Sequence, residues 1–363
     1  MRVRRIDDLD AFSRLAGPWE ALAREAGAGS PFLSHDWFAC CWRAPRGRRP
    51  EVLLVEDGAG PVALVPLALS EERIRGLRAR VLRMLTAPDT PFVDWIVAGP
   101  ATPALDAVLG YLRGRRDWDV LLLDALPVES RVLKALEDGT SGGLRWHGLG
   151  RTPRPVVDVT GGWEAYWNRT SQRFKKTFRS VRNRLERAGT LTIEEHRALD
   201  APRLAEIMDV SRRSWKASRD LAMANMQEMP DFFRELSERA ARRGWLRAWI
   251  LRLDGRAVAT EYQLEAEGRV HGLRADIDAD LPADLSPGSY LNGHIVRALF
   301  ERDGVHEYDM GPGDSEYKSR WATGRHETAR HRAFGRRPWG ALLGAIETGA
   351  VPMLRRVRAG VTA

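Results

Sequence analysis

A short segment late in the chain gathers side chains suited to acid–base chemistry. Asp309 ends an apolar strand and precedes a Gly-Pro-Gly loop, and Tyr317 and Lys318 follow within a few residues. A carboxylate at the end of a core strand can orient or deprotonate an amine, a phenol can protonate a leaving group, and an ammonium can stabilise an oxyanion. Capping of the glycine loop is the alternative role for Asp309, and the sequence leaves both roles open.

Two neighbouring segments supply candidate ligands for a phosphate-bearing substrate. Arg320 has the geometry to bind a phosphate bidentately, and Trp321 beside it is expected to line a cleft. Upstream, the segment Ser286-Pro287-Gly288-Ser289-Tyr290 opens a predicted helix, whose first turn can present N–H groups to an anion. A plain helix start, with Ser286 as the cap and Pro287 in the first turn, explains the same residues.

A basic helix is predicted within residues 163–188. Its apolar residues recur at helical spacing, and eight Lys or Arg side chains between Arg169 and Arg187 face only one acidic residue, Glu186. A solvated helix face is the usual explanation. The alternative that we favour is a surface that binds an anionic glycan intermediate, a coenzyme phosphate or a lipid headgroup, with Arg173 and Lys176 as contact residues.

Composition narrows the class of protein that must position these groups. The chain has 363 residues, a net charge of +8 and 44% hydrophobic residues, which fits two globular domains and excludes a disordered or fibrous protein. The two cysteines, Cys40 and Cys41, are adjacent, so they indicate a reducing compartment, and we expect a cytoplasmic protein. His326 and His331 lack suitable partners, so we expect no metal site.

The order of predicted elements occurs twice along the chain. Hairpins with Asp-Gly turns are predicted at residues 51–69 and 244–265. Each hairpin is followed by a helix and a strand, which ends at Asp124 in the first half and at Asp309 in the second. We therefore predict tandem α/β domains at residues 1–155 and 156–338, with mixed, mostly antiparallel sheets flanked by helices, and a basic amphipathic tail at 339–363.

In the second half, a strand, two helices, three antiparallel strands, a helix and a strand are expected in that order. With the basic helix and the motifs at 286–291, 307–314 and 317–321, this succession resembles the BioF2-like and CelD-like acetyltransferases of the GNAT superfamily, which are linked with cellulose and exopolysaccharide synthesis. Fem-type peptidyltransferases are related and also carry two GNAT-like domains. The long helical arm of many Fem-type enzymes is absent, which argues against transfer RNA as the donor.

The resemblance implies direct transfer of an acyl group from acyl-CoA, with acetyl-CoA as first choice, to an amine or hydroxyl of a sugar or envelope precursor. In that reaction Asp309 would be base or orienter, Tyr317 the acid, and Lys318 a charge stabiliser. Residues 286–290 and Arg320 would hold the donor. The usual Gln/Arg-x-x-Gly-x-Gly/Ala phosphate cradle is not found there.

The first half would be a degenerate domain on the acceptor side. Asp94 lies in a loop that matches a family loop bordering the acceptor cleft, and Asp276 near the end of a strand is a second candidate for acceptor contact.

Two other functions remain open. One is a Fem-type transferase that uses aminoacyl transfer RNA, and the other is a non-catalytic subunit of a polysaccharide synthesis or export complex. A peripheral contact with an anionic membrane surface at the inner membrane face is a further option, and nucleic acid is not an expected partner.

Overall fold

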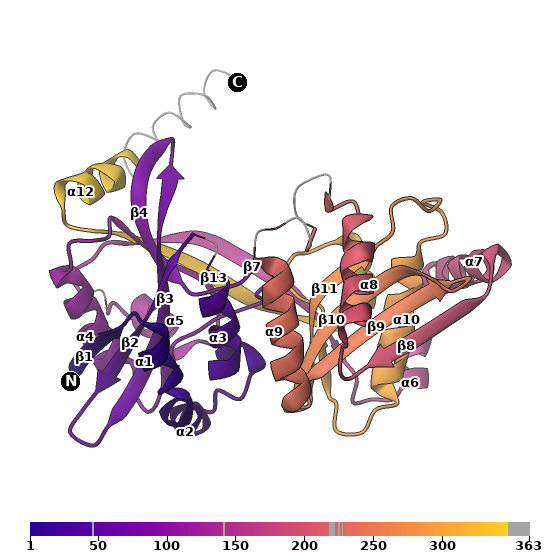
Figure 1. The fold of residues 1–363 in the computed structure, drawn as a ribbon, viewed down its shortest axis with the longest axis horizontal. Helices are drawn as coiled ribbons and strands as arrows, with labels where there is room; N and C mark the ends of the chain where they lie inside the picture. Colours follow the sequence, from indigo (N-terminus) through magenta and orange to yellow (C-terminus); the bar gives the residue numbers. More distant parts are fainter. Residues whose placement is uncertain (46, 141, 218–221, 224–225, 227, 348–363) are drawn as a thin grey trace.

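The computed structural model describes residues 1–45, 47–140, 142–217, 222–223, 226 and 228–347. Its strands form one continuous sheet in the order β1-β2-β3-β4-β6-β13-β7-β12-β11-β10-β9-β8, and β5 pairs with β3. The sheet runs through both halves of the chain, which lie side by side as two lobes (Figure 1). Residues 348–363 of the predicted basic tail lie outside the described residues.

The first lobe contains the predicted hairpin, in which β2 and β3 are antiparallel and join at Asp57. Its elements are β1 (Arg2–Ile6), α1 (Leu9–Ser13), α2 (Ala16–Ala26), the short 3-10 helix η1 (Pro31–Leu33), α3 (His35–Arg43), β2 (Arg49–Glu56), β3 (Pro61–Ile74), β4 (Leu77–Met84), β5 (Ile96–Val97), α4 (Ala101–Gly114), β6 (Val120–Pro127) and α5 (Arg131–Glu137).

The second lobe repeats this plan, with β9 and β10 as the predicted hairpin. The remaining elements are β7 (Trp146–Asp158), α6 (Trp163–Arg169), α7 (Gln172–Ala188), β8 (Leu191–His196), α8 (Ala201–Arg212), α9 (Met229–Arg242), β9 (Leu246–Leu253), β10 (Arg256–Ala266), β11 (Arg269–Ile277), α10 (Pro287–Phe300), β12 (Glu307–Asp309), α11 (Glu316–Trp321), β13 (Gly324–Phe334) and α12 (Pro338–Ala345). The single helix predicted at 163–188 is two helices, because Ser171 caps a new one by accepting a hydrogen bond from the Phe174 amide.

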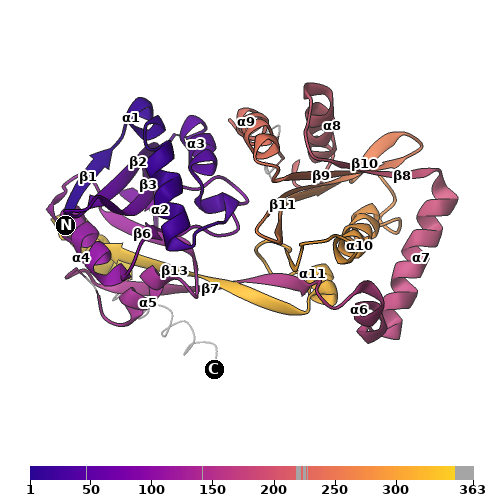
Figure 2. The same ribbon diagram turned by 90° about the horizontal axis from the view of Figure 1, so that it is seen from below.

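Two long strands connect the lobes. β7 and β13 pair along most of their length, β13 also pairs with β6 in the first lobe, and β12 pairs with the end of β7 in the second (Figure 2). The predicted boundary near residue 155 therefore falls inside β7, and residues 324–334 return to the sheet of the first lobe. The division into domains at that residue stays a prediction.

In each lobe a parallel strand pair separates after a few residues. In the second lobe, Arg269–His271 of β11 pair with Glu307–Asp309 of β12, and β11 then continues to Ile277 without this neighbour. In the first lobe, Val81–Arg83 of β4 pair with Val120–Leu122 of β6. The loop after β12 turns away because Gly311 adopts a positive φ of 79°, a conformation that glycine adopts without steric cost.

Helices cover both faces of the second lobe's sheet. α8 and α9 lie on one face and α10 on the other (Figure 2). Apolar side chains of the strands alternate between these two layers, so that Tyr262 and Leu264 join the core shared with the first lobe, whereas Val258 and Val270 pack with α10. Within the described residues, no helix combines the length and apolar character needed to cross a membrane.

Candidate functional site

A cavity of about 450 Å³ opens where β11 separates from β12. We call it the wedge cavity. Strands β10, β11 and β12, the first turns of α10 and the residues around α11 contribute its walls. Its lining includes Lys216, Thr260, Glu261, Gly272, Asp276, Gly288, Ser289, Asn292, Tyr308, Met310, Gly311, Ser315, Tyr317 and Lys318. The predicted site residues Tyr317, Lys318, Gly288, Ser289 and Asp276 thus lie around one space.

Gly272 stands at the point of separation. A Cβ atom there would lie 3.3 Å from Glu261 Oε1 and 3.5 Å from the Tyr308 hydroxyl. Any longer side chain at this position would run into one of these groups. The glycine therefore leaves room for the Glu261 carboxylate and the Tyr308 hydroxyl to meet at the apex of the wedge cavity.

Lys318 and Tyr317 enter the wedge cavity from α11. The Lys318 ammonium donates hydrogen bonds to the carbonyl oxygens of Gly311 (3.1 Å) and Pro312 (2.9 Å), which hold it beside the loop after β12. Burial lowers the pKa of Lys318 from its ordinary value, although the nearby carboxylates oppose this shift. Partial burial and the charge of Glu261 raise the pKa of the Tyr317 phenol, although 42% of the residue's surface is exposed, and the phenol is protonated at neutral pH.

Glu261 is a site residue that the sequence analysis missed. Its carboxylate lies buried in β10, where it accepts hydrogen bonds from the Tyr308 hydroxyl and from Gln263 Nε2 (2.8 Å). Burial raises the pKa of Glu261, and these two donors only partly offset the effect. A carboxylate with a raised pKa beside a phenol suits proton transfer near neutral pH. The signal in the sequence was an acidic residue within a strand of otherwise buried residues.

Two buried polar groups of the wedge cavity have no hydrogen-bond partner among the residues that the structure describes. These are Nδ2 of Asn292, a residue that is 3% exposed, and Oγ of Ser315. A buried donor or acceptor without a partner is costly, so such groups in native proteins commonly await a ligand or water. An arm that carries amide groups, such as the pantetheine arm of coenzyme A, supplies the missing acceptors and donors. The cavity therefore fits a coenzyme A donor.

The start of α10 has a mixed character. Ser286 adopts a left-handed conformation (φ 47°), and its hydroxyl donates to the Ala283 carbonyl (3.2 Å) instead of capping the helix. Pro287 occupies the first turn, as the plain helix start predicted. A Cβ at Gly288 would lie 2.2 Å from Ile277 Cδ1, so this glycine lets α10 approach β11 closely. Gly288 and Ser289 line the wedge cavity, while Tyr290 lines a different groove on the outer side of α10.

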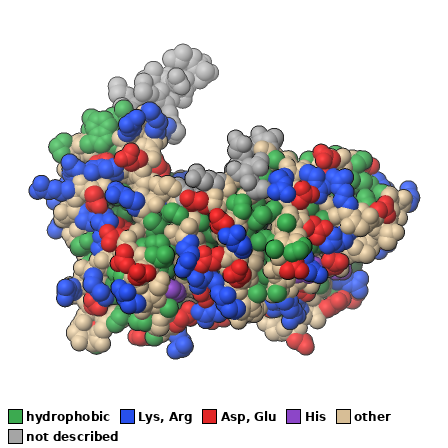
Figure 3. All heavy atoms as spheres, in the orientation of Figure 1, with side chains coloured by type: hydrophobic (Ala, Val, Ile, Leu, Met, Phe, Trp, Pro, Cys, Tyr) green, Lys and Arg blue, Asp and Glu red, His purple; other side chains and the backbone are tan. Residues whose placement is uncertain are grey.

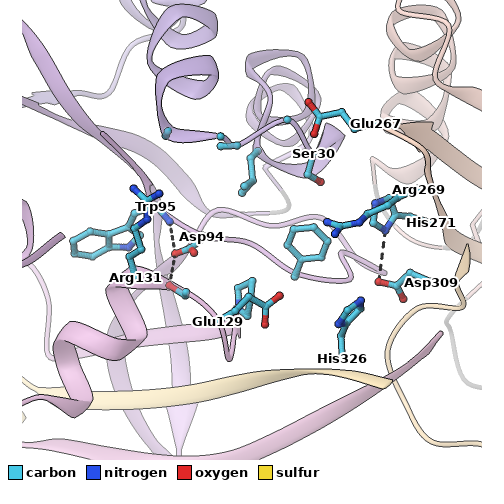
Figure 4. A pocket seen from close by; sticks show the side chains of 18 of the residues that line it. Ser30, Asp94, Trp95, Glu129, Arg131, Glu267, Arg269, His271, Asp309 and His326 are labelled. Atoms are coloured by element: carbon cyan, nitrogen blue, oxygen red, sulfur yellow. Dashed lines mark hydrogen bonds and ion pairs between the residues drawn. The ribbon is translucent and has the colours of Figure 1, made fainter. Parts of the chain in front are cut away.

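Asp309 faces a second cavity, of about 290 Å³, between the two lobes (Figure 4). We call it the interlobe cavity. Arg154 of β7 donates to the Asp309 carboxylate (2.8 Å), the Gly311 amide donates to it as well (2.9 Å), and His271 Nδ1 lies 3.5 Å away. Burial alone would raise the pKa of Asp309, but His271 and Arg154 outweigh burial and lower the pKa to about 2. The alternative role as a cap of the glycine loop is thus present, together with a permanent negative charge.

Asp94 lies across the interlobe cavity from Asp309. It accepts hydrogen bonds from the Ser130 hydroxyl (3.0 Å) and the Trp95 amide (2.8 Å), and within the described residues no arginine or lysine is hydrogen-bonded to it (Figure 4). Burial raises the pKa of Asp94 to about 7, against the effect of these two hydrogen bonds. Both predicted carboxylates therefore face the same space with opposite pKa shifts.

The buried nitrogen atoms of this cavity strengthen its case as a binding site. Arg154 Nε and Trp95 Nε1 have no hydrogen-bond partner among the described residues, and both side chains are almost fully buried. The His271 ring packs against Phe32 and Phe92, and its Nδ1 faces the Asp309 carboxylate. A polar ligand in the interlobe cavity would satisfy these groups.

Several predicted residues stand apart from both cavities or are already paired. Asp276 lines the wedge cavity, but Arg274 (2.7 Å) and Lys216 (3.2 Å) already neutralise it. Trp321 does not line a cleft. It is 2% exposed and packs against Phe174 and Phe178 in the core, since aromatic residues of α7 cover it.

Arg320, Arg173 and Lys176 point away from the wedge cavity. Arg320 is half exposed and pairs with Glu316 one helical turn earlier, on the outer side of α11. Arg173 and Lys176 lie on the exposed side of α7. On the face drawn in Figure 3, basic and acidic side chains are interspersed over both lobes, so the net positive charge is not gathered there. α7 is the stretch where basic residues have few acidic neighbours.

No group of three or more His, Cys, Asp or Glu suited to a metal ion occurs among the residues that the structure describes. The site chemistry described above is carried by carboxylates, phenols, an ammonium and amide groups.

Comparison with known proteins addresses the fold of this chain. Residues 172–319 match the family described as an acetyltransferase (GNAT) domain. Among solved structures, FemX has the same fold, with a TM-score of 0.60 and 12% identity over 94% of this chain and 99% of that one. No curated protein sequence matches the chain.

Two further structures extend the comparison. The C-terminal domain of a putative lysylphosphatidylglycerol synthetase from Agrobacterium fabrum has a TM-score of 0.52 and 16% identity, with 91% of this chain and 96% of that one covered. A tandem GNAT protein from the clavulanic acid biosynthesis pathway has a TM-score of 0.52 and 12% identity, with coverage of 92% and 98%. The predicted fold of two GNAT-like domains in tandem is confirmed.

Proposed function

We propose, from the premise that residues 172–319 form a GNAT-type acetyltransferase domain, that this protein transfers an acyl group from acyl-CoA to an amine or hydroxyl. Acetyl-CoA is the first-choice donor, and a sugar or cell-envelope precursor of exopolysaccharide is the acceptor class. The observation that carries the proposal is the wedge cavity, where Lys318, Tyr317 and two unpartnered polar groups surround the gap between β11 and β12.

The donor would place its pantetheine arm in the wedge cavity. The amide groups of the arm would pair with Asn292 and Ser315, which now lack partners. The thioester carbonyl would then lie near the apex at Gly272, within reach of Lys318. The first turn of α10, from Ser286 to Tyr290, would face the phosphates.

The acceptor would enter from the interlobe cavity, on the other side of the strand pair. Asp309 is held as an anion by Arg154, so it would orient a protonated amine but would be a weak base. Asp94, on the first lobe, would contact the same acceptor. In this arrangement the first lobe contributes to substrate binding and the second carries the donor.

Transfer would proceed by direct attack in a ternary complex. The neutral amine nitrogen bonds to the thioester carbon, and Lys318 stabilises the oxyanion of the tetrahedral intermediate. The C–S bond then breaks, Tyr317 gives its proton to the leaving thiolate, and the amine proton passes to Glu261, whose raised pKa suits a base. The products are the acylated amine and the free thiol of coenzyme A.

A binding and turnover experiment tests the proposal. We expect coenzyme A to raise the Tm of the full chain and acetyl-CoA to be consumed with amino-sugar acceptors. Lys318→Ala and Tyr317→Phe should each lower turnover by roughly 10²-fold while the fold is retained. A rise in Tm with charged transfer RNA but not with coenzyme A would instead support an aminoacyl transferase, the alternative that the resemblance to Fem-type enzymes leaves open.

A non-catalytic role in a polysaccharide synthesis or export complex is the remaining candidate. The absence of the usual Gln/Arg-x-x-Gly-x-Gly/Ala motif before α10 favours this non-catalytic role. Turnover that depends on Lys318 would refute it. We place the reaction in the cytoplasm, and the basic side of α7, including Arg173 and Lys176, is the surface that we assign to peripheral contact with anionic lipid or substrate.

A further inference from the structure

A separate groove of about 560 Å³ runs along the outer side of α10, between that helix, α6 and α7. We call it the aromatic–arginine groove. Four aromatic side chains, three arginines, a histidine, a glutamate and a glycine line it: Trp163, Trp167, Phe178, Tyr290, Arg179, Arg182, Arg297, His294, Glu186 and Gly293. Tyr290 belongs to the first turn of α10, and the other nine residues have no role in the acyl transfer proposed above.

The aromatic rings of the groove are arranged for stacking. Trp163 and Trp167 stack with their ring centres 5.1 Å apart and 20° between their planes, and Phe178 and Tyr290 are nearly parallel at 6.4 Å. Each of these side chains is only partly buried. Aromatic faces that remain accessible at a protein surface are the usual platform for a planar base.

The charge of the groove favours a phosphate. Arg179, Arg182 and Arg297 outnumber the single lining carboxylate, Glu186. Arg182 holds an exposed ion pair with Glu186 (3.7 Å), and Arg297 holds one with Glu301 (3.1 Å) while its guanidinium lies 6.0 Å from the centre of the Trp163 ring. Exposed pairs of this kind stabilise a protein little, so a phosphate can replace the carboxylate at small cost.

The groove and the wedge cavity meet at the start of α10. Ser289 lines the wedge cavity and the next residue, Tyr290, lines the groove, because they occupy different sides of the first turn. Arg184 of α7 donates to the Asp284 carbonyl (2.8 Å), which fixes α7 beside the loop that leads into α10. A ligand that leaves the wedge cavity across the helix start therefore arrives at the aromatic–arginine groove.

We propose that the aromatic–arginine groove binds the phosphorylated adenosine end of the coenzyme A donor. The adenine ring stacks on the aromatic side chains, and the phosphates pair with Arg179 and Arg182. This inference rests on the proposed function and supplies a phosphate site from α7, in place of the cradle motif that the sequence lacks.

Calorimetric titration of the full chain tests the assignment, with coenzyme A and adenosine 3′,5′-bisphosphate as separate probes. The double variant Arg179→Ala/Arg182→Ala is expected to lower the affinity for both probes by about tenfold or more. This is the loss associated with one or two charge-assisted hydrogen bonds. Arg187→Ala is the matched control, because this arginine is exposed on the same helix and lies outside the groove. Unchanged melting curves would establish that the variants are folded.

Kinetics with two donors sharpen the result. The double variant should raise KM for acetyl-CoA and leave KM for S-acetyl-pantetheine, which lacks the nucleotide, unchanged. Equal affinity of the double variant and the native chain for coenzyme A would overturn the inference while leaving the proposed function standing. An equal loss in Arg187→Ala would also overturn it, since the effect would then be general electrostatics.

Failure of the proposed function has a different signature. Binding of adenosine bisphosphate that depends on Arg182, without turnover of any acyl thioester, would refute acyl transfer and support the nucleotide site. Binding of charged transfer RNA but not of coenzyme A would overturn both.

Discussion

Each lobe has a parallel strand pair that separates, β4 with β6 in the first lobe and β11 with β12 in the second, but different side chains lie at the two gaps. In the first lobe, Arg83 of β4 reaches across the separation to Asp124 of β6 (2.5 Å) and also pairs with Glu72 (2.9 Å). In the second lobe, the residue after the last paired position of β11 is Gly272, which has no side chain to reach across the gap, and the Tyr308 hydroxyl meets Glu261 beside it. The cavity beside Asp124 measures about 230 Å³, against about 450 Å³ for the wedge cavity.

This difference teaches that topology alone does not create a donor site. Both lobes have the parallel pair, the helix that follows and an aspartate near the strand end, yet an ion pair occupies the gap in one lobe and space remains in the other. Asp309 also pairs with an arginine, but this residue, Arg154, belongs to β7, which lies on the other side of β12 from β11. The wedge cavity is thereby left clear.

The largest effect on stability is expected at the buried ion pair of the second lobe. Arg154→Leu leaves Asp309, 1% exposed, without its cation, and should lower the free energy of unfolding by about 3–5 kcal/mol. Arg83→Leu should cost less, because Asp124 is more exposed. Urea unfolding measures both. Addition of Asp309→Leu to Arg154→Leu should restore part of the loss, and equal losses at the two lobes would contradict the comparison.

The open gap predicts that activity depends on Lys318. We expect Lys318→Ala to reduce kcat by roughly 10²-fold through lost oxyanion stabilisation, and to cost about 1 kcal/mol of stability through two lost hydrogen bonds. Steady-state kinetics and thermal unfolding measure these effects. Ser319→Ala, which changes the next residue of α11 outside the wedge cavity, is the control, and a similar kcat for both variants would count against the site.

The two carboxylates of the interlobe cavity predict opposite pH responses. The folded pKa of Asp94, about 7, lies above its ordinary 3.8, so the folded state holds the proton more tightly and stability falls as pH rises from 4 to 7. Asp94→Asn should therefore stabilise the protein by up to about 4 kcal/mol above pH 7 and little below pH 4.

Asp309 behaves in the reverse sense. Its folded pKa of about 2 lies below 3.8, so its contribution is complete above pH 4 and is lost as pH falls towards 2. Asp309→Asn should be destabilising at pH 7 and approach the native chain near pH 2. Unfolding curves at several pH values measure both variants, and parallel pH profiles would contradict the contrast between the lobes.

A smaller effect on stability and coenzyme A affinity is expected when the wedge cavity is filled by a larger apolar side chain. Asn292→Leu removes an unpartnered buried amide, so stability should be unchanged or higher, while the affinity for coenzyme A should fall by about tenfold. Calorimetry and thermal unfolding measure the two quantities. An unaltered affinity would show that the donor does not contact this side chain.

The order of elements was readable from the sequence because its signals are local. Asp-Gly turns, apolar strands and the repeated succession of helix and strand predicted both hairpins and the tandem fold, and each signal depends only on neighbouring residues. Tyr317 and Lys318 were found for the same reason, since a glycine loop and a helix place them directly after β12.

Tertiary structure decided which of the candidate groups meet. Glu261 and Asn292 join the wedge cavity from elements that lie far apart in the chain, and Trp321 is buried because the distant helix α7 covers it. The direction of each pKa shift likewise depended on neighbours in space. Arg154 lies beside Asp309, whose pKa is lowered, whereas Asp94, whose pKa is raised, has no hydrogen-bonded cation in the described residues. Local spacing specifies elements, whereas burial and pairing arise only when those elements pack.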